Sequence, residues 1–365
     1  YFASNSALSE ALFRACNTWL GHRRGGLALA TIGGCAGFGA VCGSSLATAA
    51  TMGRVALPEM LSRGYSQTLA TGSIAAGGTL GMLIPPSVIM VIYAFLAEQF
   101  VITLFVAALV PGIIAVLAHF ITIGILVRRD PMSGPAGAKF AWPERLAVLK
   151  KSWGVLVLLF AVIGGIYGGV FTVNEAAALG AFLAFLFTVA RRKLSVESFW
   201  LVLKDTAANS AMIYLIIAGA SIFSSFITVT KMPDALVSAI AAMDLAPLAV
   251  ILVLMVVYLI LGSIFDTVAA MVITMPFVFP LIVDLGYSPI WWGVVLVMMI
   301  EVGMITPPIG MNVFVLFGVA GNIPLKTIFK GILPFFYADI LRILLIIIFP
   351  PLTLWLPGLL GYNLG

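Results

Sequence analysis

The sequence predicts an all-α polytopic membrane protein built from inverted-topology repeats, each with a re-entrant helical hairpin and a discontinuous transmembrane helix. Two observations carry this prediction. First, 62% of the 365 residues are hydrophobic and only 9% are charged, whereas soluble domains carry about 25% charged residues. The long apolar runs are typical of spanning helices rather than of a barrel. Second, one pattern interrupted by Gly and Pro occurs twice, which is typical of secondary transporters. The net charge of +5 is small, and in such a chain the basic residues indicate membrane topology rather than a nucleic-acid partner.

The duplication is visible in the sequence itself. The segment GSSLATAATM at residues 43–52 is followed by GYS and then by GGTLGMLIPPS, whereas GSIFDTVAAM at residues 262–271 is followed by GYS and then by EVGMITPPIGMN. Positions that match at one constant spacing are Gly64 and Gly286, Met82 and Met304, and Pro85 and Pro307. Matching over such a length is not expected by chance, so we interpret the two segments as copies of one unit.

The first repeat is predicted to occupy residues 1–127. Arginines flank residues 27–60 on both sides, and basic residues mark the cytoplasmic side, so this stretch is predicted to enter and leave there. Proline breaks helices, and unwound backbone at membrane depth is tolerated only inside protein or beside a cavity. In order, the predicted elements are an interfacial helix at 1–21, an inward-opening hairpin at 27–60 with its tip near 43–45, a spanning helix at 66–97 broken at Gly77-Gly78, Gly81 and Pro85-Pro86, and a returning helix at 102–127.

The second repeat is predicted to occupy residues 153–360, after a basic cytoplasmic loop at 128–152. Its predicted elements are crossings at 153–171, 176–190 and 206–230, an interfacial helix at 232–246, an outward-opening hairpin at 247–284 with its tip at Gly262–Thr267, a helix at 287–320 broken at Gly303 and Pro307-Pro308, and a crossing at 332–360. This threading gives seven crossings and two hairpins. Because only the second repeat has helices ahead of its interfacial helix, we expect further N-terminal spanning segments before residue 1.

Small and polar residues gather at the two hairpin tips and the two helix breaks. At a tip, the last carbonyls and the first amides of two helices lack intrahelical partners. Carbonyls and hydroxyls suit a hard cation, whereas amides at helix N-termini suit a carboxylate. The sequence therefore predicts a sodium ion where each tip meets the break of its own repeat, and an anionic substrate between the tips. The alternative is close helix packing through small residues, which is common in membranes.

Three acidic residues lie inside or beside apolar stretches, where a charge is costly. Asp266 lies just past the second tip and is expected to strengthen cation binding there, because Ala47 holds the matching position in the first repeat. The alternative for Asp266 is a helix cap. Glu175 is either the N-terminal charge of its helix or part of an ion pair with another segment. Glu301 precedes the second break and is expected to orient the unwound backbone or to face the water path.

The other charges in apolar stretches are assigned to structure. Asp339 and Arg342 are spaced i, i+3, which favours a local ion pair, and His119 is expected to be hydrogen-bonded across helices. The sequence contains no nucleophile–base arrangement, Walker loop, dinucleotide fingerprint or metal-ligand cluster. We therefore predict that the chain is not an enzyme.

Several motifs, in order along nearly the whole chain, resemble the large membrane (M) subunit of tripartite ATP-independent periplasmic (TRAP) transporters. They are Gly25-Gly26-Leu27, Gly43-Ser44-Ser45, Pro58-Glu59-Met60 with Gly64-Tyr65, Ile84-Pro85-Pro86-Ser87, Pro111-Gly112, Phe171-Thr172 with Glu175-Ala176-Ala177, Gly262 with Asp266, and Thr306-Pro307-Pro308-Ile309-Gly310-Met311-Asn312. Two positions depart from the family pattern. Cys42-Gly43-Ser44-Ser45 stands where the family usually has Ser-Gly-Ser-Ala, and Thr172-Val173-Asn174-Glu175 where it often has Thr-Pro-Thr-Glu. These departures leave the substrate open.

The resemblance implies sodium-coupled import of an organic acid, such as sialic acid or a C4-dicarboxylate, by an elevator motion in the inner membrane of a bacterium or archaeon. The implied partners are a periplasmic substrate-binding protein, a small four-helix membrane subunit and the lipid bilayer. Two or more sodium sites are implied, formed by Gly43, Ser44, Ser45, Gly81, Gly262, Asp266, Thr267, Gly303 and Thr306. The residues implied near the substrate are Ser45, Pro86, Ser87, Gly310 and Asn312.

Other functions are compatible with the residues alone. A sodium/anion symporter of the same superfold that needs no binding protein would show similar repeats, and uptake by liposomes without added soluble protein would distinguish it. An ion channel is a further alternative, and a transport rate that saturates at the turnover of a carrier would exclude it. A membrane-embedded enzyme is disfavoured because the sequence offers no acid–base or metal constellation.

Overall fold

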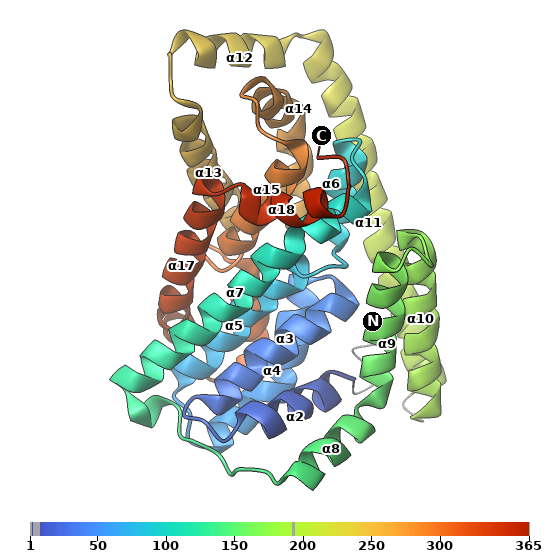
Figure 1. Ribbon diagram of the computed structural model, residues 1–365, viewed down its shortest axis with the longest axis vertical. Helices are drawn as coiled ribbons and strands as arrows, with labels where there is room; N and C mark the ends of the chain where they lie inside the picture. Colours follow the sequence, from blue (N-terminus) through green and yellow to red (C-terminus); the bar gives the residue numbers. More distant parts are fainter. Residues whose placement is uncertain (1, 3–7, 192–193, 365) are drawn as a thin grey trace.

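The computed structural model describes residue 2, residues 8–191 and residues 194–364. All regular elements in these ranges are helices, as predicted (Figure 1). In chain order they are α2 (Leu8–Leu20), α3 (Gly26–Cys42), α4 (Ser45–Ser62), α5 (Gln67–Leu83), α6 (Val88–Leu96), α7 (Val101–Arg129), η1 (Pro131–Ser133), α8 (Trp142–Lys151), α9 (Trp153–Tyr167), α10 (Val173–Ala190), α11 (Val196–Val229), α12 (Met232–Ala242), α13 (Pro247–Ile264), α14 (Thr267–Asp284), α15 (Pro289–Gly303), α16 (Met311–Ala320), α17 (Leu325–Ile348) and α18 (Pro351–Leu359).

The helices confirm a polytopic membrane protein. Within the described residues, six helices are long and apolar enough to cross a membrane, namely α7, α10, α11, α13, α14 and α17. The number rises to eight if two bent pairs each form one span, namely α5 with α6, bent by 41°, and α8 with α9. The seven crossings, the re-entrant course of the hairpins and the inverted orientation of the repeats stay predictions.

The same order of elements occurs twice along the chain. A short helix, α2 or α12, precedes a pair of helices, α3–α4 or α13–α14. A helix broken near a pair of prolines follows, α5–α6 or α15–α16, and then a long helix, α7 or α17. Both proline pairs, Pro85-Pro86 and Pro307-Pro308, lie in the linker between the two segments of their broken helix. Because proline cannot donate a backbone hydrogen bond, the helix stops at each pair.

The core is built on α5 and α15, the first segments of the two broken helices. Every residue from Leu69 to Leu83 and from Ile290 to Gly303 is buried. Helices α3, α4 and α17 pack around α5, while α7 and α13 pack against α15. A Cβ added to Gly72 on α5 would overlap the backbone of Gly331 on α17. The two halves of the chain therefore meet backbone to backbone at this crossing.

Helix α11 differs sharply from this core. It has 34 residues but buries only Val202 and Ile227. In Figure 1 it runs along one side of the molecule, from the region of α9 and α10 up to α12. Its apolar side chains are therefore available to lipid or to another membrane subunit.

The first break is shorter than predicted. Gly77, Gly78 and Gly81 lie inside α5, which continues past all three, so we define the first break as residues 84–87. The glycines serve close packing instead, since a Cβ on Gly78 would lie 2.8 Å from the Cβ of Ala49 on α4. Neighbouring helices thus keep this glycine-rich stretch helical.

At three other places the helices begin or end where the sequence predicted no helix boundary. The 128–152 loop contains η1 and α8, whose start is fixed by the Glu144 carboxylate accepting from the N–H of Ala141 at 3.0 Å. The predicted loop before residue 206 is the first part of α11. The predicted 332–360 crossing is two helices, α17 and α18, because Pro350 and Pro351 supply no backbone donors.

Candidate functional site

The first hairpin turns between α3 and α4. Gly43 has φ of +62°, a left-handed conformation that favours glycine. Ser44 then caps α4, because its hydroxyl accepts from the N–H of Ala47 at 3.4 Å. Ser45 is the first residue of α4 and is buried. We define Gly43, Ser44 and Ser45 as the first tip.

The first tip lies directly against the first broken helix. A Cβ on Gly81 would lie 2.6 Å from Oγ1 of Thr48 and 2.8 Å from the carbonyl oxygen of Ser44. The Thr48 hydroxyl donates to that same carbonyl at 2.7 Å. A Cβ on Gly43 would lie 3.1 Å from the carbonyl oxygen of Pro86. The structure therefore brings the first tip together with Gly81 and with the first break.

The second hairpin turns between α13 and α14. We define the second tip as residues 262–267; Gly262 and Ser263 belong to the last turn of α13, so the turn itself is shorter than predicted. Asp266 is the N-cap of α14, and its carboxylate accepts from the N–H of Val268 at 3.0 Å. The structure therefore supports the cap interpretation of this residue. The other oxygen lone pairs of the carboxylate leave room for a cation as well.

The second tip contacts the second broken helix in the same manner. We define the second break as residues 304–310, between α15 and α16. A Cβ on Gly303 would lie 2.7 Å from the Cα of Gly262. The N–H of Gly310 donates to the carbonyl of Ser263 at 3.1 Å. This break is therefore fixed to its own tip by the main chain.

One methionine joins the two tips. The Ser45 hydroxyl donates to Sδ of Met304 at 3.4 Å, and the Thr267 hydroxyl donates to the same sulfur at 3.1 Å. Sδ of Met82 lies 4.0 Å from the Thr267 hydroxyl. The constant spacing of these two methionines in the sequence was the available signal, but it did not predict a role for them. The tips of both repeats therefore meet around Met304.

Helix ends of both kinds converge at this place. Helices α4, α6, α14 and α16 begin at the tips and breaks, and helices α3, α5, α13 and α15 end there. The beginnings carry positive partial charge and free N–H groups, and the ends carry negative partial charge and free carbonyls. One small region can therefore hold both an anion and a cation, using uncharged backbone groups.

Two buried polar side chains at the breaks have no hydrogen-bond partner. Ser87, the N-cap of α6, is 1% exposed, and its hydroxyl makes no capping bond. Asn312, in the first turn of α16, is fully buried, and neither atom of its amide group has a partner. Unpaired buried polar groups are rare and call for an explanation such as a ligand or water. Both residues were predicted to lie near the substrate.

The donors at each tip–break contact fit a sodium ion. Sodium is a hard cation that prefers carbonyl, hydroxyl and carboxylate oxygens. The hydroxyls of Thr48 and Thr306 each donate one hydrogen bond, to the carbonyls of Ser44 and Val302, at 2.7 and 2.6 Å. Oγ1 of Thr48 also lies 3.1 Å from Sγ of Cys42, and each hydroxyl oxygen keeps at least one lone pair that can bind a cation. Thr48 was missed by the sequence analysis; its position one helical turn after Ser44 was the only signal.

The two predicted structural charges lie elsewhere. Glu175 forms a capping box with Thr172, whose N–H and hydroxyl donate to the carboxylate at 2.8 and 2.9 Å. These bonds support the helix-terminus interpretation rather than an ion pair with another segment. Glu301 is fully buried in the last turn of α15, where Arg342 is its ion-pair partner. It therefore faces protein rather than a water path.

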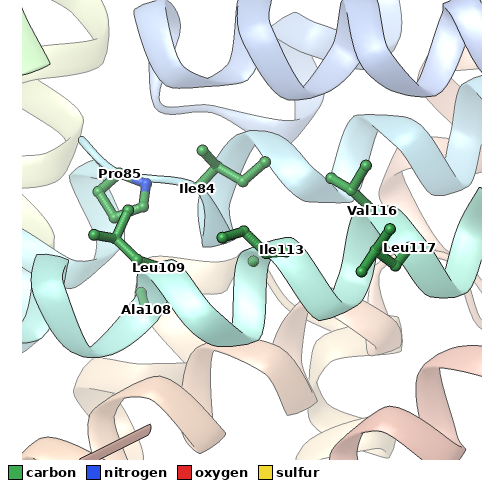
Figure 2. Close-up of a pocket in the computed structure, with 8 residues that line it drawn as sticks. Ile84, Pro85, Ala108, Leu109, Ile113, Val116 and Leu117 are labelled. Carbon is green, nitrogen blue, oxygen red and sulfur yellow. The ribbon is translucent and has the colours of Figure 1, made fainter. Parts of the chain in front are cut away.

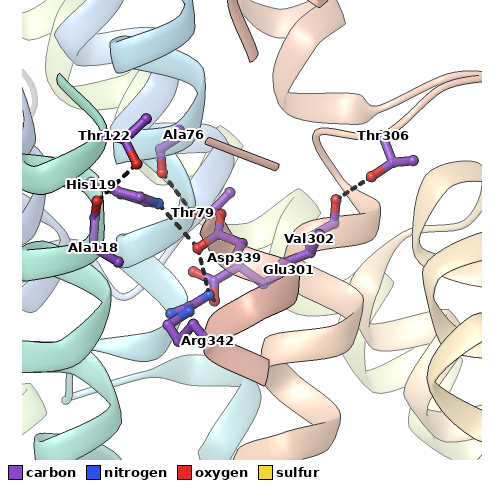
Figure 3. A network of polar contacts seen from close by, with 10 residues as sticks. All are labelled: Ala76, Thr79, Ala118, His119, Thr122, Glu301, Val302, Thr306, Asp339 and Arg342. Atoms are coloured by element: carbon purple, nitrogen blue, oxygen red, sulfur yellow. Dashed lines mark hydrogen bonds and ion pairs between the residues drawn. The ribbon is translucent and has the colours of Figure 1, made fainter. Parts of the chain in front are cut away.

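Glu301 belongs to a charged cluster, which we define as His119, Glu301, Asp339 and Arg342 (Figure 3). Nη2 of Arg342 lies 3.1 Å from Oδ1 of Asp339 and 3.7 Å from Oε2 of Glu301. Nε2 of His119 lies 3.1 Å from the same Asp339 oxygen. The local Asp339–Arg342 pair and the cross-helix bond of His119 are thus confirmed. The cluster joins α7, α15 and α17.

An apolar cavity of about 200 Å³ lies beside the first break (Figure 2). It is lined by residues of the first break and of the middle of α7, namely Ile84, Pro85, Ala108, Leu109, Gly112, Ile113, Val116 and Leu117. Ile113 and Leu117 are also exposed on the outer surface of α7. The lining offers no charged or polar side chain, so this cavity does not suit an organic acid.

Comparison with known proteins agrees with this architecture. The family described as "Tripartite ATP-independent periplasmic transporter, DctM component" matches residues 1–352. A C4-dicarboxylate TRAP transporter large permease protein of Pseudomonas aeruginosa is 35% identical over 364 residues, which cover 99% of this chain and 84% of that protein. A sialic acid TRAP transporter large permease protein of Vibrio cholerae is 30% identical over 366 residues, covering 100% of this chain and 85% of that protein.

A third relative has a different substrate in its name. An isethionate TRAP transporter permease protein of Oleidesulfovibrio alaskensis is 34% identical over 351 residues, which cover 96% of this chain and 55% of that longer protein. All three relatives are named as transporter permeases rather than enzymes, which confirms the prediction that the chain is not an enzyme. With a family match over nearly its whole length, the chain belongs to the DctM family of TRAP transporter large permeases.

Proposed function

We propose that this protein imports an organic acid across the inner membrane, driven by a sodium gradient. A periplasmic binding protein delivers the acid, a small membrane subunit braces the large one, and an elevator motion carries the site across. The observation that carries the proposal is the meeting of two tips and two breaks around Met304, with Ser87 and Asn312 buried and unpaired beside them.

The geometry supports different roles for different groups in the site, some for the substrate and others for sodium. Four helix N-termini and the unpaired side chains of Ser87 and Asn312 offer donors to a carboxylate. Carbonyl and hydroxyl oxygens at each tip–break contact offer ligands to sodium. Asp266 adds a negative charge at the second tip only, so we expect the second sodium site to bind more tightly than the first.

The substrate is an organic acid whose identity is open. The relatives are named for C4-dicarboxylates, sialic acid and isethionate. An amide such as Asn312 both donates and accepts hydrogen bonds. We therefore expect an acid that also carries a hydroxyl or amide group to bind better than the same acid without one.

The test is uptake into proteoliposomes that contain the full-length protein and its small subunit. A panel of labelled acids is offered with and without the binding protein, under an inward sodium gradient or with sodium replaced by choline. We expect uptake that requires both sodium and the binding protein. Uptake that needs no binding protein would favour the simpler symporter, and uptake indifferent to sodium would refute the coupling.

Two variants test whether the substrate binds at the proposed site. Asn312→Ala and Ser87→Ala each remove a donor to the acid, so KM is expected to rise about ten- to hundredfold, the value of a hydrogen bond to a charged group. Ser225→Ala, on exposed α11, removes a hydroxyl that bonds only its own helix and is the matched control. Unchanged KM in both site variants would place the substrate elsewhere.

A further inference from the structure

The charged cluster lies one helical turn from the second break. Glu301 is on the last turn of α15, two residues before Gly303, which packs against Gly262 of the second tip. Met304 follows and contacts both tips. A displacement of Glu301 along or around the axis of α15 therefore moves the backbone that faces both tips.

The cluster draws on matching positions of the two repeats. Glu301 and Thr79 each precede one of the matched methionines by three residues. His119 and Arg342 each follow a proline in the middle of a long helix, Pro111 and Pro334, by eight residues. Thr79 lies beside the cluster in Figure 3, but its hydroxyl donates to its own helix, to the carbonyl of Ala76 at 2.6 Å. Of these two matching positions, Glu301 therefore carries a charge and Thr79 does not.

Apart from its ion pairs, the cluster leaves many polar atoms without a hydrogen-bond partner. Both carboxylate oxygens of Glu301, Oδ2 of Asp339 and Nε and Nη1 of Arg342 have no hydrogen-bond partner. All four residues are at most 2% exposed. Such a set is costly to bury and stabilises the protein less than apolar packing would. A geometric role accounts for such a set, because a planar guanidinium donates to carboxylates only in fixed directions.

We propose that His119, Glu301, Asp339 and Arg342 are positioning residues for the second sodium site. Arg342 fixes the height and rotation of α15 through Glu301, and His119 fixes Arg342 through Asp339. The carbonyl of Gly303 and the hydroxyl of Thr306, which would be ligands to the ion, are thereby held in place beside the second tip. This inference rests on the proposed sodium-coupled transport.

The test compares sodium affinity with maximal rate. Arg342→Lys keeps the charge but replaces the planar guanidinium, whose Nη2 contacts both carboxylates, with a shorter ammonium group, and Arg342→Gln removes the charge. Groups that orient ligands without touching the metal are worth about ten- to hundredfold in metal affinity. We therefore expect the sodium concentration for half-maximal uptake to rise about tenfold in the first variant and further in the second. The maximal rate at saturating sodium should change little.

A second readout does not depend on transport. Sodium should raise the thermal unfolding temperature of the purified wild-type protein, and the concentration for half of that shift should rise in the Arg342 variants by the same factor. The control is Arg63→Gln, which breaks the exposed ion pair with Glu59 on α4 and should change neither value. A merely structural role would lower the unfolding temperature but leave both sodium concentrations unchanged, and this outcome would overturn the inference.

His119 provides variants that disturb the fold less. His119→Gln keeps an amide N–H donor near the position of Nε2, whereas His119→Leu removes the donor to Asp339. We expect near wild-type sodium affinity for the first and weakened affinity for the second. If the Arg342 variants do not fold, equal affinities in the two His119 variants would overturn the inference. A wild-type protein that shows no response to sodium would instead refute the proposed coupling itself.

Discussion

Gly81→Ala is expected to push the first tip away from α5. The new Cβ would lie 2.8 Å from the carbonyl oxygen of Ser44, whereas ordinary contacts begin at 3.4 Å, so that carbonyl must move by about 0.6 Å. Thr48 cannot relieve the contact independently, because its hydroxyl is bonded to the same carbonyl and would lie 2.6 Å from the new Cβ. The perturbation therefore falls on the tip backbone.

The expected effect of this change is on transport more than on stability. Overpacking costs about 1–3 kcal/mol, and alanine in place of glycine in a helix returns up to about 1 kcal/mol. The net loss of stability is thus about 0–2 kcal/mol. A displacement approaching 1 Å at a binding site can cost about a hundredfold in rate, so we expect sodium-driven uptake to fall about ten- to hundredfold.

The assay is initial uptake into proteoliposomes, together with the thermal unfolding temperature of the same preparation. Gly124→Ala, on α7, is the matched control, because a Cβ there meets nothing within 4 Å. Uptake should be unchanged or slightly higher in the control. If Gly81→Ala transports as well as Gly124→Ala, the close approach of tip and helix has no part in transport.

The remaining predictions concern packing, the second tip and topology. Gly72→Ala should lower the unfolding temperature strongly, because its Cβ overlaps the backbone of Gly331, and a cost of about 3 kcal/mol or more is expected; an unchanged melting curve would refute the crossing. Asp266→Asn should keep the cap on Val268 and near-normal stability but weaken sodium dependence, while Asp266→Ala should also lose about 1 kcal/mol; equal sodium dependence in all three proteins would leave this residue as a cap alone. With the native cysteines replaced, Ala136→Cys in the predicted cytoplasmic loop should react with a membrane-impermeant maleimide only after cells are opened. Labelling of intact cells would place this loop outside the cell and refute the predicted topology.

The breaks show what the sequence determines locally. A proline pair removes two backbone donors wherever it stands, so Pro85-Pro86 and Pro307-Pro308 predicted interruptions that the structure contains. Glycine only lowers helix propensity, and its effect depends on the neighbours. Gly78 and Gly81 therefore read as a break in the sequence, although they are contact points for α4 and the first tip.

The site shows what the sequence determines only in part. Repeat spacing predicted which segments matter, and the unpaired Asn312 and Ser87 lie at those segments. The spacing could not predict that Met304 contacts hydroxyls from both tips, because this needs the two repeats to be packed against each other. The pairing of Arg342 with Asp339 followed from helical periodicity. Its contact with Glu301 did not, because only tertiary packing brings α15 and α17 together.

The crossing of α5 and α17 limits which parts of the molecule can move relative to each other. Gly72 and Gly331 interlock main chain from opposite copies of the duplicated unit, with no side chains between them to slide or rotate. The two copies of the duplicated unit therefore cannot move apart as two separate rigid bodies. Any part that moves as a rigid body must therefore contain segments of both copies.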